Sequence, residues 1–329
     1  MGCVAVTIRG RRLTLAVGLA LVAMAPSSAA APAGPPSNVS ARLTLDNDHF
    51  NFWQPPGWRP DFGYTHGTEL AIRFPRAPRA LARFTPAWLM GEEGRHGVPS
   101  LELRFRQNIY SPWTRPADRP YAGWLEGAVG LSRGNARSHR ELLVHAGVTG
   151  PPSLAGSVQR TLHRRIDAIA PPNWDDQLPF EPGVGLEAGA AQRFAAGGGP
   201  AGWSAHLGGA GRLRLGTYAV DLRLGIPLVM GWSPRGPWPA ATPRNRGASL
   251  YVRAHPHLDL IARDEFLDGT LFRDSPGPGS RALVGESEVA FGCGWNRLQL
   301  EWVVFRRSRE FDGQPNPHTY ASLSAAWNP

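Results

Sequence analysis

Residues Leu250 to Leu260 read LYVRAHPHLDL and alternate between apolar and polar side chains. The apolar positions are Leu250, Val252, Ala254, Leu258 and Leu260, and the positions between them carry Tyr251, Arg253, His255, His257 and Asp259. A period of two is typical of a β-strand, because successive side chains point to opposite faces. One apolar face and one strongly charged face suit a barrel strand with lipid outside and a polar interior.

The same alternation recurs along the chain, for example over 218–228 and 297–304. We predict about twelve strands, near 41–47, 65–74, 100–108, 122–132, 140–148, 181–193, 203–214, 217–228, 248–262, 281–293, 296–305 and 318–327. A soluble sandwich or a soluble barrel with an apolar interior would also alternate, and the pattern alone does not say which face is inside. The expected fold is an all-β transmembrane antiparallel barrel, with one short helix inserted between strands.

Residues 1–31 have the pattern of a secretory signal peptide. Arg9, Arg11 and Arg12 precede an apolar run over 13–24, and small residues at 28–31 offer cleavage after Ala30 or Ala31. The run is too short to span a membrane, and no stretch of about 18 apolar residues follows it. We therefore expect residues 32–329 to form a single outer-membrane barrel domain.

The charge of the chain limits its expected binding partners, and its cysteine content limits its disulfides. The net charge of +9 falls to 9 − 3 = +6 without the three arginines of the signal, and all 35 basic residues are arginine. Genome composition is the favoured explanation of this bias. Arginine also binds phosphate in a bidentate manner, so an anionic lipid headgroup is a plausible partner. The arginines form no cluster or tail, which argues against nucleic acid. Only Cys293 would remain after cleavage, so no internal disulfide is expected, and no pattern in the sequence requires more than a monomer.

The stretch 153–169 is predicted to be the one helix in an otherwise β chain. Ser153 can cap its start, and Pro171 and Pro172 end it. Gln159, His163 and Asp167 recur every four residues and so share one helix face. Carboxylate, imidazole and amide in a row form a plausible set for proton transfer. The alternative is an ordinary solvated helix, because polar pairs at this spacing are common.

A group of oxygen donors closes the first predicted strand. Asp46, Asn47 and Asp48 offer two carboxylates and an amide, and Thr65 could add a hydroxyl or carbonyl oxygen from the second strand. Hard oxygen donors suit calcium. The alternative is a polar turn at a strand end, where Asn and Asp are ordinary residues.

Several further residues are candidates for substrate contacts. Arg104 and Arg106 could bind a phosphate, and the alternative is that they are charges facing the barrel interior. Arg119 lies in the dense run 118–124, and Trp174 begins a run that follows the helix. Seven tryptophans near predicted strand ends fit aromatic belts at the membrane interfaces: Trp88, Trp124, Trp203, Trp232, Trp295, Trp302 and Trp327.

In their order and spacing, these motifs resemble the lipid A 3'-O-deacylase family of Gram-negative outer membranes. The resemblance covers essentially the whole mature chain and rests on Asn47-Asp48, Tyr64-Thr65-x-Gly67, Gln107-Asn108-Ile109-Tyr110, Asp118-Arg119-Pro120-Tyr121-Ala122-Gly123-Trp124, Gly150-Pro151, Gln159-x-x-x-His163, Trp174-Asp175-x-Gln177-Leu178, Phe266-Leu267-Asp268-Gly269 and Glu310-Phe311-x-x-Gln314. The resemblance implies a twelve-stranded outer-membrane barrel. It also implies a calcium-dependent hydrolase of the ester that carries the 3'-linked acyloxyacyl chain of lipid A.

The resemblance also implies roles for individual residues. His163 would be the general base, with Gln159 orienting water or substrate, and calcium would lie near Asp48, Asn47 and Thr65; the periodicity adds Asp167 as an expected ligand. Three positions depart from the family pattern, His66, Asn173 and Ala117, and they bear mainly on the metal site. Two other functions stay open: an outer-membrane phospholipase acting on glycerophospholipids, and an inactive barrel with a binding or structural role.

Overall fold

The protein was described from a computed structural model. The structure describes residues 4–8, 11–15, 38–52, 62–90, 98–114, 117–135, 137–165, 174–198, 202–232, 247–275 and 277–328. The chain divides into two units, Met1–Pro32 and Ala33–Pro329. The first unit contains a two-stranded antiparallel sheet of β1 (Val4–Ile8) and β2 (Arg11–Leu15). Cleavage of this segment as a signal peptide stays a prediction.

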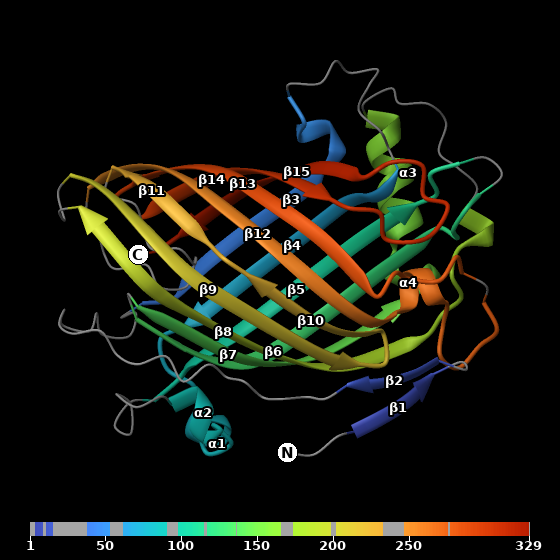
Figure 1. Cartoon of the computed structure of the whole chain (residues 1–329), viewed down its shortest axis with the longest axis horizontal. Helices are drawn as coiled ribbons and strands as arrows, with labels where there is room; N and C mark the ends of the chain where they lie inside the picture. Colours follow the sequence, from blue (N-terminus) through green and yellow to red (C-terminus); the bar gives the residue numbers. More distant parts are fainter. Residues whose placement is uncertain are drawn as a thin grey trace. The chain divides into compact units, whose positions relative to one another are not determined.

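The second unit is a closed antiparallel barrel with twelve strand positions (Figure 1). Its strands are β3 (Ser40–Asn47), β4 (Gly63–Phe74), β5 (Ser100–Ser111), β6 (Ala122–Gly134), β7 (Ser138–Thr149), β8 (Pro182–Gly198), β9 (Trp203–Gly216), β10 (Ala219–Gly225), β11 (Leu228–Trp232), β12 (Ala248–Asp264), β13 (Leu283–Trp295), β14 (Leu298–Arg307) and β15 (His318–Trp327). Apart from β10 and β11, each strand pairs with its neighbours in sequence order, and β15 closes the ring by pairing with β3.

The predicted segment 217–228 contributes to two strands that together fill one position in the ring. Both β10 and β11 pair with β9 on one side and β12 on the other. The break falls at Ile226 and Pro227, because proline has no N–H to give to the ladder. The predicted fold class and number of strands are confirmed.

The two faces of the barrel wall are inverted relative to a soluble protein. On β12, Leu250, Leu258 and Leu260 are 58, 40 and 44% exposed, whereas Tyr251 and Asp259 are 3 and 2% exposed. The apolar side chains thus point outward, and the charged ones fill the interior, where arginines and carboxylates line a cavity of about 460 Å³. This is the arrangement expected of a barrel surrounded by lipid.

The tryptophan prediction holds in part. Trp203, Trp232, Trp295 and Trp327 are exposed at strand ends, and the pairing of Trp232 with Trp203 places these two at the same rim. Trp124 instead points inside, where it is 1% exposed and stacks on Tyr218 with ring centroids 4.6 Å apart. Trp88 lies in α2 and Trp302 stacks on Phe291, so neither belongs to a belt at a strand end.

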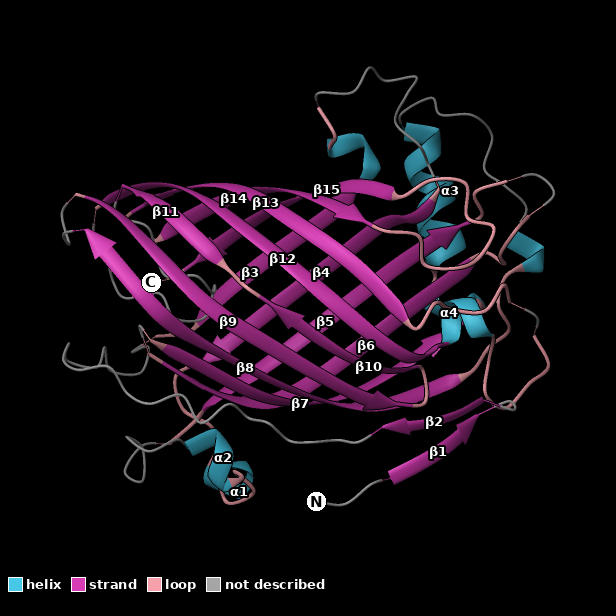
Figure 2. Cartoon of the chain, viewed as in Figure 1, coloured by secondary structure: helices cyan, strands magenta, loops and turns pink. Residues whose placement is uncertain are grey.

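The helices lie outside the sheet, at its ends (Figure 2). They are α1 (Arg79–Ala82), α2 (Ala87–Met90), α3 (Ala155–Arg165) and α4 (Glu265–Asp268), with 3-10 helices at Asp48–Phe50, Pro151–Ser153 and Trp174–Asp176. The prediction of a single helix was therefore wrong, because α1, α2 and α4 are single turns of four residues, too short to give a helical period in the sequence. Among the described residues, none of these helices could cross a membrane. Helix α3 follows β7 and lies at the rim where β5 ends and β6 begins, which makes it the element that positions the site below.

Candidate active site

The helix begins later than the sequence predicts. Gly150, at φ +71°, turns the chain out of β7, and residues 151–153 form a short 3-10 helix before α3 starts at Ala155. The Ser153 hydroxyl donates to the carbonyl of Gly150 at 2.6 Å and accepts from the backbone N–H of Ala155 at 3.5 Å. Ser153 therefore stabilises the turn before the helix and does not serve as the predicted cap.

A glycine in the barrel wall lets this turn and helix approach closely. A Cβ on Gly123 of β6 would lie 2.2 Å from the Ser153 Oγ and 2.3 Å from the Ala155 Cβ, far inside contact distance. Gln107 of β5 adds a hydrogen bond, since its Nε2 donates to the carbonyl oxygen of Ser153 at 2.7 Å. The first turn of α3 is thus packed directly on β5 and β6.

The helix lies against the outer face of the wall. Asn108 and Tyr110 line the interior cavity, whereas Ile109 between them lines a pocket under α3. Asp46 and Asn47 also point to opposite faces: Asp46 lines the interior cavity and Asn47 lines the pocket. Because neighbouring strand residues point to opposite faces, the pocket lies outside the barrel, on the side that faces lipid.

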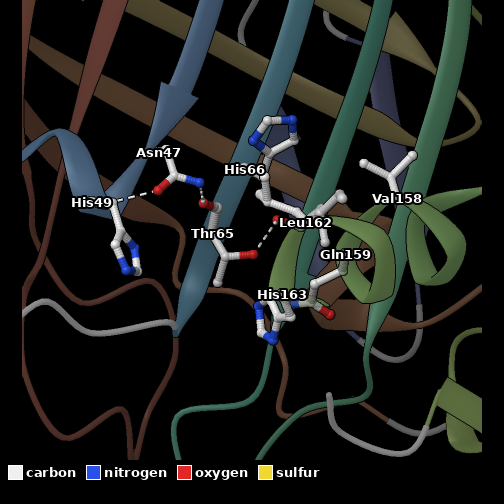
Figure 3. Close-up of a pocket in the computed structure, with 9 residues that line it drawn as sticks. Asn47, His49, Thr65, His66, Val158, Gln159, Leu162 and His163 are labelled. Carbon is white, nitrogen blue, oxygen red and sulfur yellow. Dashed lines mark hydrogen bonds between the residues drawn. The ribbon is translucent and has the colours of Figure 1, made fainter. Parts of the chain in front are cut away.

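Figure 3 shows this pocket, with strand residues on one side and helix residues on the other. It is lined by Asn47, His49, Thr65, His66, Ile109, Val158, Gln159, Leu162 and His163. The cavity measures about 20 Å³, which is room for about one water molecule. Two predicted helix residues and two predicted strand residues therefore share one pocket of the size that a single water requires.

Gln159 is held at both ends of its amide. Its Nε2 donates to the Ser111 hydroxyl of β5 at 3.2 Å, and its Oε1 accepts from the Trp174 indole Nε1 at 2.7 Å. Gln159 and Trp174 are 3 and 2% exposed. These bonds connect the middle of α3 to the wall on one side and to the segment after the helix on the other, so the position of the helix face is fixed.

His163 lies one turn further along the same face. It is 9% exposed and lines the pocket together with Thr65 and Asn47. Val158 and Leu162, four residues apart on α3, line the pocket with apolar side chains. An imidazole beside a pocket of this size can exchange a proton with a water molecule that occupies it.

On the strand side, Asn47 organises the end of β3. Its Oδ1 accepts from the backbone N–H of His49 at 2.8 Å, and its Nδ2 donates to the carbonyl oxygen of Thr65 at 3.2 Å. The register of β4 against β5 shifts between Tyr64 and His66, and this irregularity brings both Thr65 and His66 to the pocket. The Thr65 hydroxyl donates to the carbonyl oxygen of Ile109 at 3.4 Å.

His66, one of the departures from the family pattern, lies within the pocket lining. Its Nε2 is 3.1 Å from the Thr68 hydroxyl, and in Figure 3 its ring lies at the opposite end of the group from the ring of His163. Of the other two departures, Ala117 is exposed in the loop before Asp118, and Asn173 lies outside the described residues.

Three of the four calcium ligands expected from the sequence lie in the described part of the chain. Asn47 and Thr65 both line the pocket. Asp48 follows in the 3-10 helix and is 1% exposed, although it is not among the residues that line the cavity. Asp167 lies outside the described residues. Amide, hydroxyl and carboxylate oxygens are the donors that calcium prefers, so the chemistry of this set fits a calcium ion.

Arg104 and Arg106 lie on the other side of the wall. Arg104 pairs with Glu102, Glu141 and Glu187, and Arg106 pairs with Glu69 and Glu126. Two arginines held by five carboxylates inside the barrel are not available to a phosphate at the outer pocket. The structure thus supports the alternative to phosphate binding, in which Arg104 and Arg106 are charges that face the barrel interior.

Arg119 and Trp174 are also buried. Arg119 is 3% exposed, donates from Nη2 to the carbonyl oxygen of Phe266 at 3.1 Å, and lies over the Tyr110 ring. Trp174 packs beside Ile109 and Ala155 in a buried apolar cluster. Their surroundings indicate that they support the loops and the helix, and neither is among the residues that line the pocket.

Sequence reasoning missed His49 as a pocket residue. It comes two positions after Asn47, in the 3-10 helix that follows β3, and both residues line the same cavity. The Asp-His pair directly after a strand end was the available signal, but the turn that directs His49 to the pocket could not be read from it.

Comparison with known proteins gives consistent results. The family of the outer membrane protein LpxR matches residues 13–328. The solved structure of LpxR from Salmonella typhimurium is 18% identical and superposes with a TM-score of 0.67, covering 88% of this chain and 99% of that one. The β-domain of the Bordetella autotransporter BrkA has 7% identity and a TM-score of 0.41 over 88% of this chain and 98% of that one, which is too low to support an argument. A search of curated proteins found no match.

Proposed function

The chain belongs to the LpxR family of outer membrane proteins, and from this membership we propose that it is an ester hydrolase that removes the 3'-linked acyloxyacyl chain of lipid A. Lipid A as the substrate, calcium as the cofactor and His163 as the base are all parts of this proposal. The location of the pocket supports it, because an outer face of a barrel is where a membrane lipid is within reach.

One observation carries the proposal. His163 and Gln159 of α3 face Asn47 and Thr65 of the wall across a cavity with room for one water molecule (Figure 3). These four residues come from three separate stretches of sequence. A base, a space for water and a group of oxygen donors in one place are the parts that hydrolysis of an ester needs.

In the proposed mechanism, a ring nitrogen of His163 removes a proton from the water as its oxygen attacks the acyl carbonyl carbon. The same proton then passes to the 3' oxygen of the sugar as the ester bond breaks, which gives a carboxylic acid and a free hydroxyl. Gln159 is a positioning residue here, because its amide already bonds to Ser111 and Trp174. Val158, Leu162 and Ile109 would exclude bulk water from this cavity.

Calcium would be held by oxygens of Asn47, Thr65 and Asp48, with Asp167 as a further proposed ligand. When bound, the ion would supply positive charge to stabilise negative charge that develops on the carbonyl oxygen. Asn47 is well placed for such a role, since its two hydrogen bonds fix the orientation of its amide.

The test uses the purified full chain in detergent with two substrates, lipid A and a glycerophospholipid. We expect release of the acyloxyacyl unit from lipid A, identified by mass spectrometry, and no release of fatty acid from the glycerophospholipid. Release from the glycerophospholipid alone would identify a phospholipase instead. A folded protein that is inactive on both substrates with calcium present would reject an enzymatic function.

A further inference from the structure

Three side chains on the interior face of β12 and β13 lie close enough to share a metal ion. His255 and His257 are two positions apart on β12, so both rings point inside, and Glu288 of β13 lies opposite His255 in the antiparallel register. Their ligand atoms all lie within 4.8 Å of one another. Among the residues that the structure describes, no other group of three or more His, Cys, Asp or Glu side chains meets this condition.

His257 has the hydrogen bonding of a metal ligand. Its side chain is fully buried, and its Nε2 lies 3.0 Å from Glu286 Oε1. In the neutral tautomer that donates from Nε2, Nδ1 is an acceptor. This atom makes no hydrogen bond and lies 3.6 Å from Glu288 Oε1. Two acceptor atoms thus face each other, and a cation between them would satisfy both. Metal-binding histidines typically donate their other ring N–H to a carboxylate in this way.

His255 completes the set from the same strand. Its Nδ1 lies 3.8 Å from Glu288 Oε2, and the centroids of the two imidazole rings are 5.2 Å apart. Gly225 of β10 leaves space for the ring, because a Cβ at that position would be 2.4 Å from His255 Nε2. Glycine at position 225 therefore allows the ring of His255 to lie beside Glu288.

With neutral histidines, the ion-pair network around these three residues has a net negative charge that a cation would offset. The ion pairs around the three residues connect four arginines, Arg42, Arg223, Arg253 and Arg307, with five carboxylates, Asp259, Glu286, Glu288, Glu301 and Glu310. With neutral histidines this network has one more negative charge than positive. Glu286 and Glu288 also border the interior cavity of about 460 Å³, from which water could complete a coordination shell.

We propose that His255, His257 and Glu288 bind a divalent transition-metal ion, best matched by zinc, which ties β12 to β13 inside the barrel. Two imidazoles and one carboxylate form a zinc ligand set, whereas calcium and magnesium prefer oxygen donors. The site is separate from the proposed active site, which lies on the outer face of β3, β4 and β5.

The test is a titration of the metal-free, untagged full chain in detergent with Zn²⁺. We expect one ion per chain with a Kd in the micromolar range or tighter, and no displacement by Ca²⁺. His255→Gln and Glu288→Gln should each weaken binding at least tenfold. His206→Gln, which removes a histidine of β9 outside the group, and His163→Gln, which removes one from the outer pocket, should leave zinc affinity unchanged.

X-ray absorption on the wild-type zinc complex gives a readout that does not depend on the folding of any variant. The proposal expects two imidazole nitrogens at about 2.0–2.1 Å from the metal. Absence of stoichiometric binding, a spectrum without imidazole ligands, or loss of zinc in His163→Gln with retention in His255→Gln would overturn it.

Discussion

The indole Nε1 of Trp174 donates a hydrogen bond to the amide Oε1 of Gln159 at 2.7 Å. Both side chains are buried, and the ring of Trp174 packs so closely on α3 that a Cβ on Gly156 would lie 2.9 Å from its Cγ. Trp174, in the segment after the helix, thus fixes the position of Gln159, which lies one turn before His163. In the proposed reaction, this contact would set how precisely the imidazole faces the pocket.

We therefore expect Trp174→Phe to lower kcat about tenfold with little change in KM. Phenylalanine keeps the ring packing but leaves the Gln159 oxygen buried without its donor, which costs about 1–3 kcal/mol. Steady-state kinetics on lipid A would measure the change. Trp327→Phe, at an exposed strand end, serves as the control and should behave as wild type. A large rise in KM with unchanged kcat would instead assign Trp174 to substrate binding.

The close approach at Gly123 allows a test of helix position without touching the pocket. Gly123→Ala should displace the turn at Ser153 and lower activity at least tenfold, while the barrel itself still forms. Gly127→Ala is the matched control on the same strand and face, because its Cβ would meet no atom nearer than 4.0 Å. Activity on lipid A and the heat-dependent gel mobility of the barrel would be measured together. Equal activity of the two variants would mean that the contact at Gly123 does not position the helix.

The strands could be predicted because each obeys one simple rule. A residue such as Leu258 must face lipid, and its neighbour Asp259 must face the interior, so alternation marks each strand to within a few residues. The helix face with Gln159 and His163 could be predicted for a similar reason, since a four-residue spacing depends only on helix geometry.

The remaining features depend on contacts between distant residues. Nothing in the local sequence shows that Arg104 meets Glu141 and Glu187 from other strands. The irregular register that brings both Thr65 and His66 to one pocket also arises between strands, from the pairing of β4 with β5. Trp174 looked available to a substrate because its partner Gln159 lies in a different segment.

The proposed calcium site predicts a specific metal requirement. Chelation should abolish hydrolysis, and Ca²⁺ should restore it where Mg²⁺ does not. Asp48→Asn keeps the shape of the side chain but removes its charge, so the Ca²⁺ concentration for half-maximal activity should rise about tenfold. Asp46→Asn is the matched control, because Asp46 points into the barrel. An equal effect of both variants would argue against a role for Asp48 as a ligand.

Stability should depend on pH through Glu265 in α4. Burial, and then the nearby carboxylate of Glu181, raise the pKa of Glu265 from 4.5 to about 8. Between these two pH values the folded state binds more protons at this group than the unfolded state, so the free energy of unfolding falls as pH rises. The melting temperature should drop by a few degrees between pH 5 and pH 8, and Glu265→Gln should flatten this slope. An unchanged slope in the variant would contradict the assignment.

Mass spectrometry of lipid A from Gram-negative cells that express the chain tests the central claim most directly. The wild-type chain should remove the mass of the 3'-linked acyloxyacyl group, and His206→Gln should do the same. His163→Gln, produced at the same level and folded in the outer membrane, should leave lipid A intact. Unchanged lipid A with the wild-type chain, or full removal by His163→Gln, would contradict the claim that His163 activates water at the outer face of this barrel.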